Sequence, residues 1–108
     1  MKSKKVEIEV QHFEGCPNSV EMINRVKVSI SELSDYIVYK EILVETKEVA
    51  DRVKFRGSPT VLINGIDIEN MPEPINANLS CRYYKNGIPS VEQIRELIAI
   101  KLQDEDEQ

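Results

Sequence analysis

The chain has two cysteines, and each lies in a setting where a thiol could do chemistry. Cys16 lies in FEGCPNSV, between a glycine and a proline, where an alternating segment gives way to a helical one. A thiol at a helix N-terminus is near unpaired backbone N–H groups and the positive end of the helix dipole, which favour the thiolate. Glu14 and Glu21 oppose this activation. Cys81 lies in a long irregular stretch. The alternative to a chemical role is a free loop thiol for Cys81 and an inert residue at a helix start for Cys16.

Composition and charge limit what the chain can do. The 108 residues suit one domain, 41% are apolar and 31% are charged, as in ordinary globular domains. The net charge of −5 argues against general binding of nucleic acid or anionic membranes. No apolar run reaches the length of a membrane span, and the basic start precedes charged residues, unlike a secretory signal. We therefore expect a cytoplasmic protein, in which cysteines are more often catalytic, redox-sensing or metal-binding than structural.

Hydrophobic periodicity predicts the first half of the fold. Apolar and polar residues alternate over 5–12, which indicates a strand. Helical spacing of apolar residues predicts a helix over about 18–33, with Asn18 as its cap and Glu21 as a capping-box partner. A β-branched and aromatic segment near 36–44 predicts a second strand.

The second half begins with a short helix and a hairpin. KEVADRVKF predicts a helix capped by Thr46 and ended at Gly57 in the manner of a C-terminal glycine. Two short apolar runs follow, joined by Asn64-Gly65, and that dipeptide is the strongest local signal for a β-hairpin.

The chain ends in a long loop and a last helix. The loop NMPEPINANLSCRYYKNGIP is too long for a plain connection, and loops of that length are often functional. Tyr83 and Tyr84 are expected to pack it onto the sheet. Ser90 and Gln93 form a capping box for the last helix. The acidic tail, 103–108, is expected to be frayed.

The predicted order β-α-β-α-β-β-α indicates an α/β fold with one domain over 1–108. A helix long enough for a right-handed crossover makes the first two strands parallel, and the last two form an antiparallel hairpin. If the third strand runs antiparallel to the first, Ser58, Pro59 and Thr60 lie at the Cys16 end of the sheet. The loop after the fourth strand then emerges at that end too and brings Cys81 towards Cys16.

One face of the first strand does not suit a central strand. Glu7, Glu9 and Gln11 occupy it, whereas a central strand is expected to be apolar on both faces. Either the short second helix covers that face incompletely or a partner covers it. We therefore expect a monomer or a weak homodimer.

These features together resemble the thioredoxin-like superfamily, over nearly the whole chain. GCPNS resembles its active-site motif in the glutaredoxin-like Cys-Pro-x-Ser form, with Ser19 where a dithiol enzyme has its second cysteine. SPTVLINGID is similar to the superfamily's cis-proline segment, which implies that Pro59 is a cis-proline facing Cys16. More narrowly, GCPN, GSPT, NGID and LSCRYY resemble a small thioredoxin-like group associated with organomercury lyase, in which Cys81 would be a characteristic second thiol. The implied fold is a four-stranded mixed sheet with helices on both faces.

The resemblance implies a thiol-disulfide oxidoreductase with Cys16 as the nucleophilic thiolate. Since the motif lacks an adjacent second thiol, Cys81 is the candidate for the resolving thiol. The implied partner is a disulfide-bearing protein or a small thiol substrate, and no resident cofactor is expected. Glutathione is disfavoured because Asn18 replaces an aromatic residue often found there, and Glu14 lies where a positive group would be needed. The substrate-binding residues implied are Pro17, Asn18, Ser19, Ser58, Pro59 and Thr60.

Two other functions remain open at this stage. Cys16 and Cys81 could together bind a soft metal, mercuric ion or copper(I), because thiolates select soft metals. Zinc is not expected, since no Cys-x-x-Cys or His/Cys cluster is present. A redox-inert adaptor with this fold is the third reading. Ser19 is either a helix residue without a special role or a hydrogen-bond donor to the thiolate, and His12 is expected to be structural rather than a general base.

Overall fold

A computed structural model of the chain describes residues 6–106, and the predicted order of elements is confirmed. A short 3-10 turn, Ser34–Tyr36, precedes the second strand. The other elements are β1 (Val6–His12), α1 (Ser19–Ile30), β2 (Ile37–Leu43), α2 (Lys47–Val53), β3 (Thr60–Ile63), β4 (Ile66–Asp67) and α3 (Val91–Asp106).

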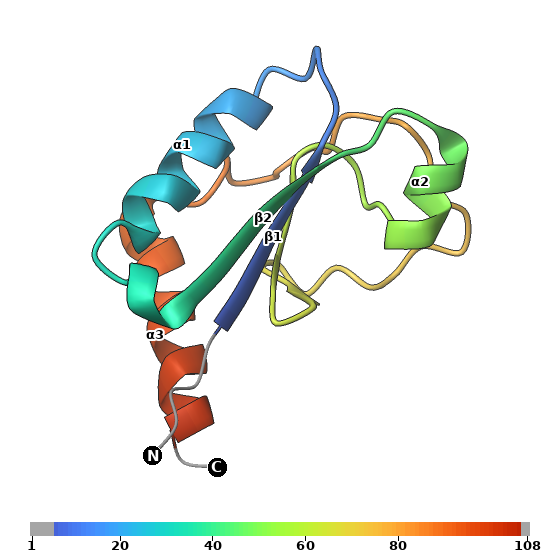
Figure 1. Ribbon diagram of the computed structural model, residues 1–108. Helices are drawn as coiled ribbons and strands as arrows, with labels where there is room; N and C mark the ends of the chain where they lie inside the picture. Colours follow the sequence, from blue (N-terminus) through green and yellow to red (C-terminus); the bar gives the residue numbers. More distant parts are fainter. Residues whose placement is uncertain (1–5, 107–108) are drawn as a thin grey trace.

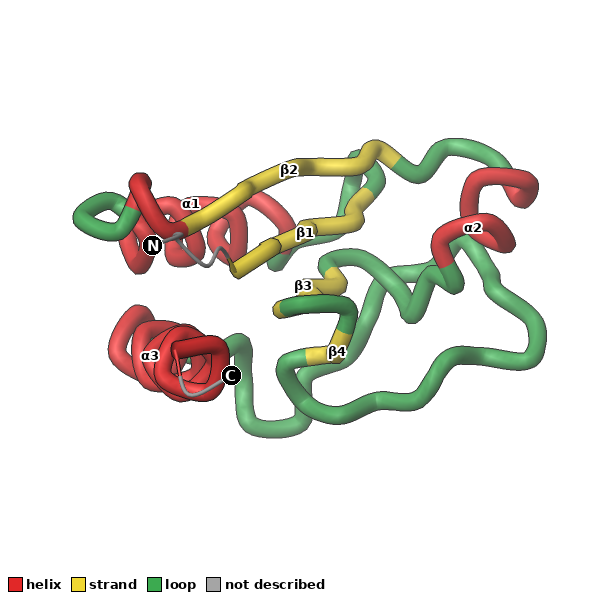
Figure 2. The backbone as a smooth tube through the Cα atoms, turned by 60° about the horizontal axis from the view of Figure 1, so that its bottom comes forward, coloured by secondary structure: helices red, strands yellow, loops and turns green. Residues whose placement is uncertain are grey.

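The four strands form one mixed sheet in the order β2-β1-β3-β4. β1 is parallel to β2 and antiparallel to β3, and β3 is antiparallel to β4, as the strand directions predicted. α1 and α3 lie on one side of the sheet and α2 on the other (Figure 1). The long loop between β4 and α3 runs out towards α2 and back before α3 begins (Figure 2). The expected α/β architecture is therefore confirmed.

The turn between β3 and β4 has the hairpin geometry that the Asn64-Gly65 dipeptide predicts. Asn64 has φ 52° and Gly65 has φ 82°, and two positive φ values in succession define the tight hairpin turn that Asn-Gly favours. β4 is shorter than the apolar pattern indicated: the Ile68 N–H still donates to the Val61 carbonyl of β3 at 3.1 Å, and the chain then turns at Asn70 (φ 60°).

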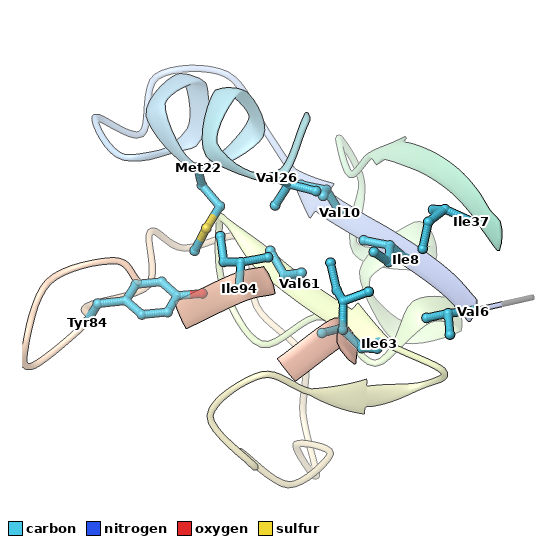
Figure 3. Close-up of a cluster of buried hydrophobic side chains, with 11 residues drawn as sticks. Val6, Ile8, Val10, Met22, Val26, Ile37, Val61, Ile63, Tyr84 and Ile94 are labelled. Atoms are coloured by element: carbon cyan, nitrogen blue, oxygen red, sulfur yellow. The ribbon is translucent and has the colours of Figure 1, made fainter. Parts of the chain in front are cut away.

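The main core lies between the sheet and the α1–α3 pair. The side chains of Val6, Ile8 and Val10 alternate towards these helices, as their spacing predicts. They pack against α1 and α3 in the cluster drawn in Figure 3, which also contains Met22, Val26, Val61, Ile63, Tyr84, Ile94 and Ile98. A second, smaller cluster joins α2 to the long loop through Val44, Ala50, Phe55 and Ala77.

The polar face of β1 is covered only at its carboxyl end. Gln11 is fully buried, and its Nε2 donates to Glu9 Oε2 (2.6 Å) and to the Val53 carbonyl of α2 (3.4 Å). Glu7 is exposed and Glu9 is half-buried. The short second helix therefore covers this face incompletely, and cover by a partner stays a prediction.

Of the three predicted helix caps, two are confirmed and one is wrong. Thr46 caps α2, since its Oγ1 accepts from the Val49 N–H at 3.1 Å. Ser90 and Gln93 form the reciprocal capping box of α3, at 3.1 and 2.8 Å. Asn18 occupies the cap position of α1, but its side chain makes no cap hydrogen bond. Its φ of −91° and ψ of −4° are not the extended backbone that lets a cap side chain reach the first turn.

Glu21, the expected capping-box partner, instead pairs with Arg25 one turn along the helix, at 2.9 Å. α1 also ends at Ile30 rather than near residue 33, and β2 begins at Ile37 because 34–36 form the 3-10 turn.

The end of α2 also differs from the prediction. α2 ends before Lys54, which adopts the left-handed conformation (φ 57°), so Gly57 is not its C-terminal glycine. α3 extends to Asp106 and so includes the first residues of the acidic tail, whose expected fraying stays a prediction. Residues 107–108, also part of that expected tail, lie outside the described range, as do 1–5. Within residues 6–106, no helix has both the length and the apolar character needed to cross a membrane.

Candidate functional site

Cys16 is positioned by the loop that joins β1 to α1. The loop turns at Gly15, whose φ of +100° strongly favours glycine, and the Cys16 carbonyl accepts the Ser19 N–H at 3.2 Å. The Met22 N–H donates to the Asn18 carbonyl at 2.9 Å as the helix begins. Cys16 therefore lies just before the first turn of α1, as the sequence predicted, and it is only 6% exposed.

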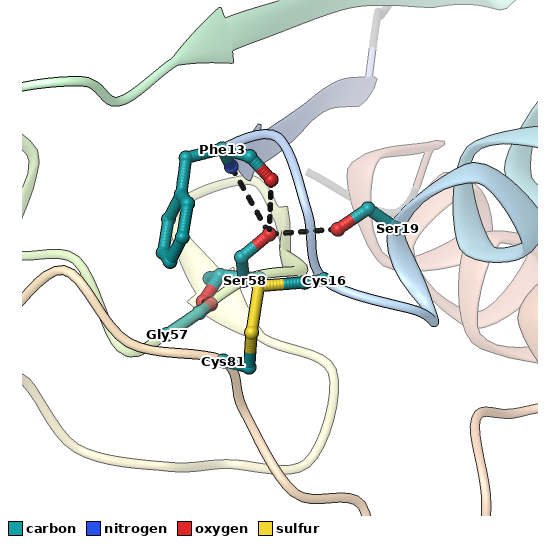
Figure 4. The surroundings of a disulfide bond; sticks show 7 residues. Phe13, Cys16, Ser19, Gly57, Ser58 and Cys81 are labelled. Carbon is teal, nitrogen blue, oxygen red and sulfur yellow. Dashed lines mark hydrogen bonds between the residues drawn. A yellow bond between two sulfur atoms is a disulfide. The ribbon is translucent and has the colours of Figure 1, made fainter.

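Cys81 lies beside Cys16, although the two residues are 65 positions apart in the chain. Their Cα atoms are 5.6 Å apart and their Sγ atoms form a disulfide (Figure 4). That Cα separation is typical of unstrained bridges. The inference that strand directions bring both cysteines to one end of the sheet is confirmed.

Backbone pairing holds the Cys81 segment against the start of β3. The Ser58 N–H donates to the Ser80 carbonyl, and the Arg82 N–H donates to the Ser58 carbonyl, both at 2.8 Å. These two bonds flank Cys81 and form a short parallel bridge between residues 58 and 81. The peptide bond between Ser58 and Pro59 is cis. The segment that carries Cys81 is thus paired, through one isolated bridge, with the residue that precedes the proline.

Three hydroxyl and backbone groups lie at the Cys16 end of the disulfide. The hydroxyls of Ser19 and Ser58 are 2.7 Å apart and both are buried. The Phe13 N–H donates to Ser58 Oγ at 3.1 Å (Figure 4). The Ser19 hydroxyl therefore ties α1 to the segment before β3, and its hydrogen bond to a Cys16 thiolate stays a prediction, because Cys16 is in the disulfide here.

A groove of about 310 Å³ opens beside the disulfide. Its lining contains Cys16, Pro17, Asn18, Ser58, Cys81, Arg82, Tyr83 and Tyr84. Of the six predicted substrate-binding residues, it therefore includes Pro17, Asn18 and Ser58. The other three, Ser19, Pro59 and Thr60, are buried and do not line the groove. The Thr60 hydroxyl donates to the Gly57 carbonyl, so this side chain supports the loop from within.

A buried ion pair next to Cys81 is the feature that sequence reasoning missed. Arg82 Nη1 and Nη2 donate to the two carboxylate oxygens of Asp67 at 2.6 and 2.7 Å, and the side chains are 1% and 0% exposed. Burial alone would raise the pKa of Asp67. Hydrogen bonds from Arg82 and from the Glu69 and Met71 N–H groups outweigh burial and hold the pKa below its usual value. Both residues lie in segments singled out above, Asp67 in NGID and Arg82 in LSCRYY, but nothing in the sequence indicated that their side chains would pair.

The remaining candidates are placed as follows. His12 Nε2 lies 3.9 Å from Glu41 Oε1 on β2, which fits the expected structural role. Tyr84 packs in the main core, as expected, whereas Tyr83 is 81% exposed and does not pack the loop onto the sheet. In the part of the chain that the structure describes, no group of three or more His, Cys, Asp or Glu side chains could hold a metal. A soft metal would therefore depend on the two cysteines.

Known structures show which fold this is. Chloroplastic thioredoxin z aligns with a TM-score of 0.60 over 94% of this chain and 80% of its own, at 15% sequence identity. The germline-specific thioredoxin Deadhead of Drosophila melanogaster aligns with a TM-score of 0.51 over 93% and 81%, at 18% identity. No protein-family model and no curated protein matches the sequence. The chain therefore has a thioredoxin-like fold, and the cysteine pair lies at the helix entrance of that fold.

Proposed function

We propose that the chain is a thiol-disulfide oxidoreductase that cycles between a Cys16–Cys81 disulfide and two thiols. The observation that carries this proposal is the pairing of a helix-entrance cysteine with a distant loop cysteine, beside a groove open to a partner. The first α1 residues have N–H groups without intrahelical acceptors, which favour a thiolate at Cys16 once the bridge is reduced. The thioredoxin-like fold is consistent with such chemistry but does not by itself establish it.

The reaction has two exchange steps. The Cys16 thiolate attacks one sulfur of a substrate disulfide, so that a mixed disulfide forms and the other substrate sulfur leaves as a thiolate. The Cys81 thiolate then attacks Cys16 Sγ and releases the second substrate thiolate. The substrate gains two electrons, the protein loses two, and the Cys16–Cys81 bond forms. Two equivalents of an external thiol, which leave joined as a disulfide, return the protein to its reduced state by the same exchange chemistry.

Substrate binding would use the backbone that now holds the Cys81 segment. In the oxidised protein, the N–H and C=O of Ser58 pair with Ser80 and Arg82. An extended substrate needs the same two groups, so it binds after the segment separates from Ser58. Pro17 and Asn18 would contact the substrate from the other wall of the groove, while Ser19, Pro59 and Thr60 act by holding that wall in place.

The expected partner is a disulfide-bearing protein or a small thiol, with no resident cofactor. The expected cytoplasmic location suits a disulfide that cycles, because lasting structural disulfides are rare there. Glutathione enters this scheme only as an external thiol.

Reduction of insulin disulfides and of glutathione disulfide by the purified protein tests the proposal. Cys16→Ser should abolish turnover, whereas Cys81→Ser should accumulate a mixed disulfide at Cys16 that mass spectrometry detects. Ser31→Ala, an exposed change at the far end of α1, is the matched control and should react like the wild type. If neither cysteine variant alters any exchange rate, the protein is the redox-inert adaptor instead.

Mercuric ion is the probe for the second candidate function. Two cysteines that lie side by side would, once reduced, supply the two thiolates of a two-coordinate soft-metal site. The reduced protein should then bind one mercuric ion with a thiolate-to-metal absorbance band, and Cys81→Ser should weaken that binding strongly. The absence of stoichiometric binding would eliminate this candidate.

A further inference from the structure

The residue that follows Cys81 is fixed far more firmly than an ordinary loop residue. Arg82 places a fully buried guanidinium against Asp67 of β4, in a bidentate pair of two short hydrogen bonds. Such a fork fixes orientation as well as distance, because both N–H groups must align with both carboxylate oxygens. Because Arg82 directly follows Cys81, its ion pair also sets the position of the Cys81 backbone relative to the sheet.

Asp67 is itself held in one orientation. Its Oδ2 accepts the backbone N–H groups of Glu69 and Met71, at 2.9 and 3.2 Å, in addition to Arg82. The carboxylate is part of the turn that leaves β4, and it cannot follow Arg82 if the loop moves. The pair therefore connects the Cys81 segment to a fixed point of the sheet.

Further contacts hold the same segment from the opposite side. The Arg82 guanidinium carbon lies 4.6 Å from the centre of the Tyr84 ring, a cation–π contact. The buried Tyr84 hydroxyl donates to the Pro59 carbonyl. The Arg82 N–H donates to Ser58. Residues 81–84 are thus attached both to β4 and to the segment that faces Cys16.

Stability alone is a weak explanation for this pair. Burying two charges has a large desolvation penalty, and apolar residues of similar volume often stabilise a protein as well or better. The pair does, however, fix a geometry. Here the geometry that it fixes is the approach of one cysteine to the other.

We propose that Asp67 and Arg82 are positioning residues for Cys81, which hold its sulfur at Cys16 and thereby make the disulfide harder to reduce. The inference deepens the proposed function, because it states what sets the potential of the proposed redox pair. Whatever raises the effective concentration of Cys81 at Cys16 favours the disulfide and lowers its reduction potential. Loosening the pair therefore raises the potential.

Equilibration of the full chain in glutathione redox buffers tests the inference. The reaction is protein dithiol plus glutathione disulfide giving protein disulfide plus two glutathione, and alkylation followed by mass spectrometry measures the protein fractions. Asp67→Asn and Arg82→Lys should each lower the equilibrium constant for the disulfide at least tenfold, a rise of about 30 mV. Tyr84→Phe, which keeps the ring under Arg82 and loses only the hydroxyl, should shift it in the same direction by less.

Two control variants separate positioning from general stability. Asp51→Asn removes a carboxylate from an exposed ion pair with Lys47 on α2, and Ile98→Val shortens a buried side chain of α3. Both should leave the potential at the wild-type value, even though Ile98→Val lowers the free energy of unfolding. A structural role that is equal in both redox states changes stability and leaves the potential unchanged.

The outcomes separate this inference from the proposed function. If the folded variants among Asp67→Asn, Arg82→Lys and Tyr84→Phe keep an equilibrium constant within about twofold of the wild type, the positioning role is overturned. If Asp67→Asn does not fold, Tyr84→Phe still decides the matter. A wild-type protein that forms no disulfide in any redox buffer would overturn the proposed function as well.

Discussion

Replacing Gly57 by alanine should disturb the site through a single added methyl group. An ideal Cβ at Gly57 would lie 2.9 Å from Arg82 Cβ, 3.1 Å from its Cα and 3.2 Å from its N. Two of these three atoms are backbone, so the contact cannot be relieved by a side-chain rotation. The change must either push the Cys81 segment away from Ser58 or strain both.

The size of the effect follows from two separate penalties. Gly57 has φ +102°, and a left-handed conformation costs an alanine about 1–2 kcal/mol. The lower entropy of the unfolded alanine chain offsets about 0.4–1 kcal/mol of this. Overpacking against Arg82 adds about 1–3 kcal/mol. We therefore expect Gly57→Ala to lower the free energy of unfolding by about 1–5 kcal/mol.

Gly15→Ala is the matched control, because Gly15 has nearly the same φ, +100°, and no atom within 4 Å of its ideal Cβ. It should lose only the backbone part, about 1 kcal/mol. Urea unfolding of the oxidised proteins, followed by circular dichroism because the chain has no tryptophan, measures the difference. Equal losses in the two variants, within about 0.5 kcal/mol, would refute the close approach of Gly57 to Arg82.

Other features of the structure lead to predictions that smaller experiments can check. Asp67 has a lowered pKa in the folded state, so its contribution to stability is complete above the unfolded value of about 3.9 and is lost as the pH falls below it. Urea unfolding between about pH 4 and 2.5 should show a steeper loss for the wild type than for Asp67→Asn, and parallel curves would contradict this. Thr46→Ala should cost about 1 kcal/mol of stability and Asn18→Ala only a few tenths, because of these two residues only Thr46 makes a cap hydrogen bond. Equal losses of stability in thermal unfolding would count against that assignment. A small thiol that reduces the disulfide should first attach to Cys81, which is exposed, rather than to the buried Cys16; peptide mapping after an acid quench would disprove this by finding the adduct at Cys16.

Local patterns were reliable wherever a few neighbouring residues determine the backbone. The alternation over β1, the Asn64-Gly65 turn and the Ser90 capping box all appear in the structure as predicted. The Asn18 cap failed because a favourable residue type does not ensure the extended backbone that a cap requires. Gly57 was predicted to end the short second helix, and that reason was wrong. A glycine is needed there because the Arg82 backbone lies where a Cβ would be.

The candidate site divides in the same way. Strand directions alone placed Cys16 and Cys81 at one end of the sheet, because parallel and antiparallel pairing determine where each loop emerges. No pattern in the sequence indicated that Asp67 and Arg82 would form a buried pair. Asp67 lies in NGID and Arg82 in LSCRYY, but neither segment shows that the two side chains meet, and their contact depends on the path of an irregular loop.

By itself, the sequence determined the order of elements, the turn chemistry and the end of the sheet at which the two thiols lie. Those properties follow from side-chain period and strand direction, which act over short stretches of chain. Only the tertiary structure decided what holds Cys81 in place: the Ser58 pairing, the close approach at Gly57 and the buried ion pair. These contacts join residues far apart in the chain, and each exists only because packing excludes water and brings particular backbones within a few ångströms of one another.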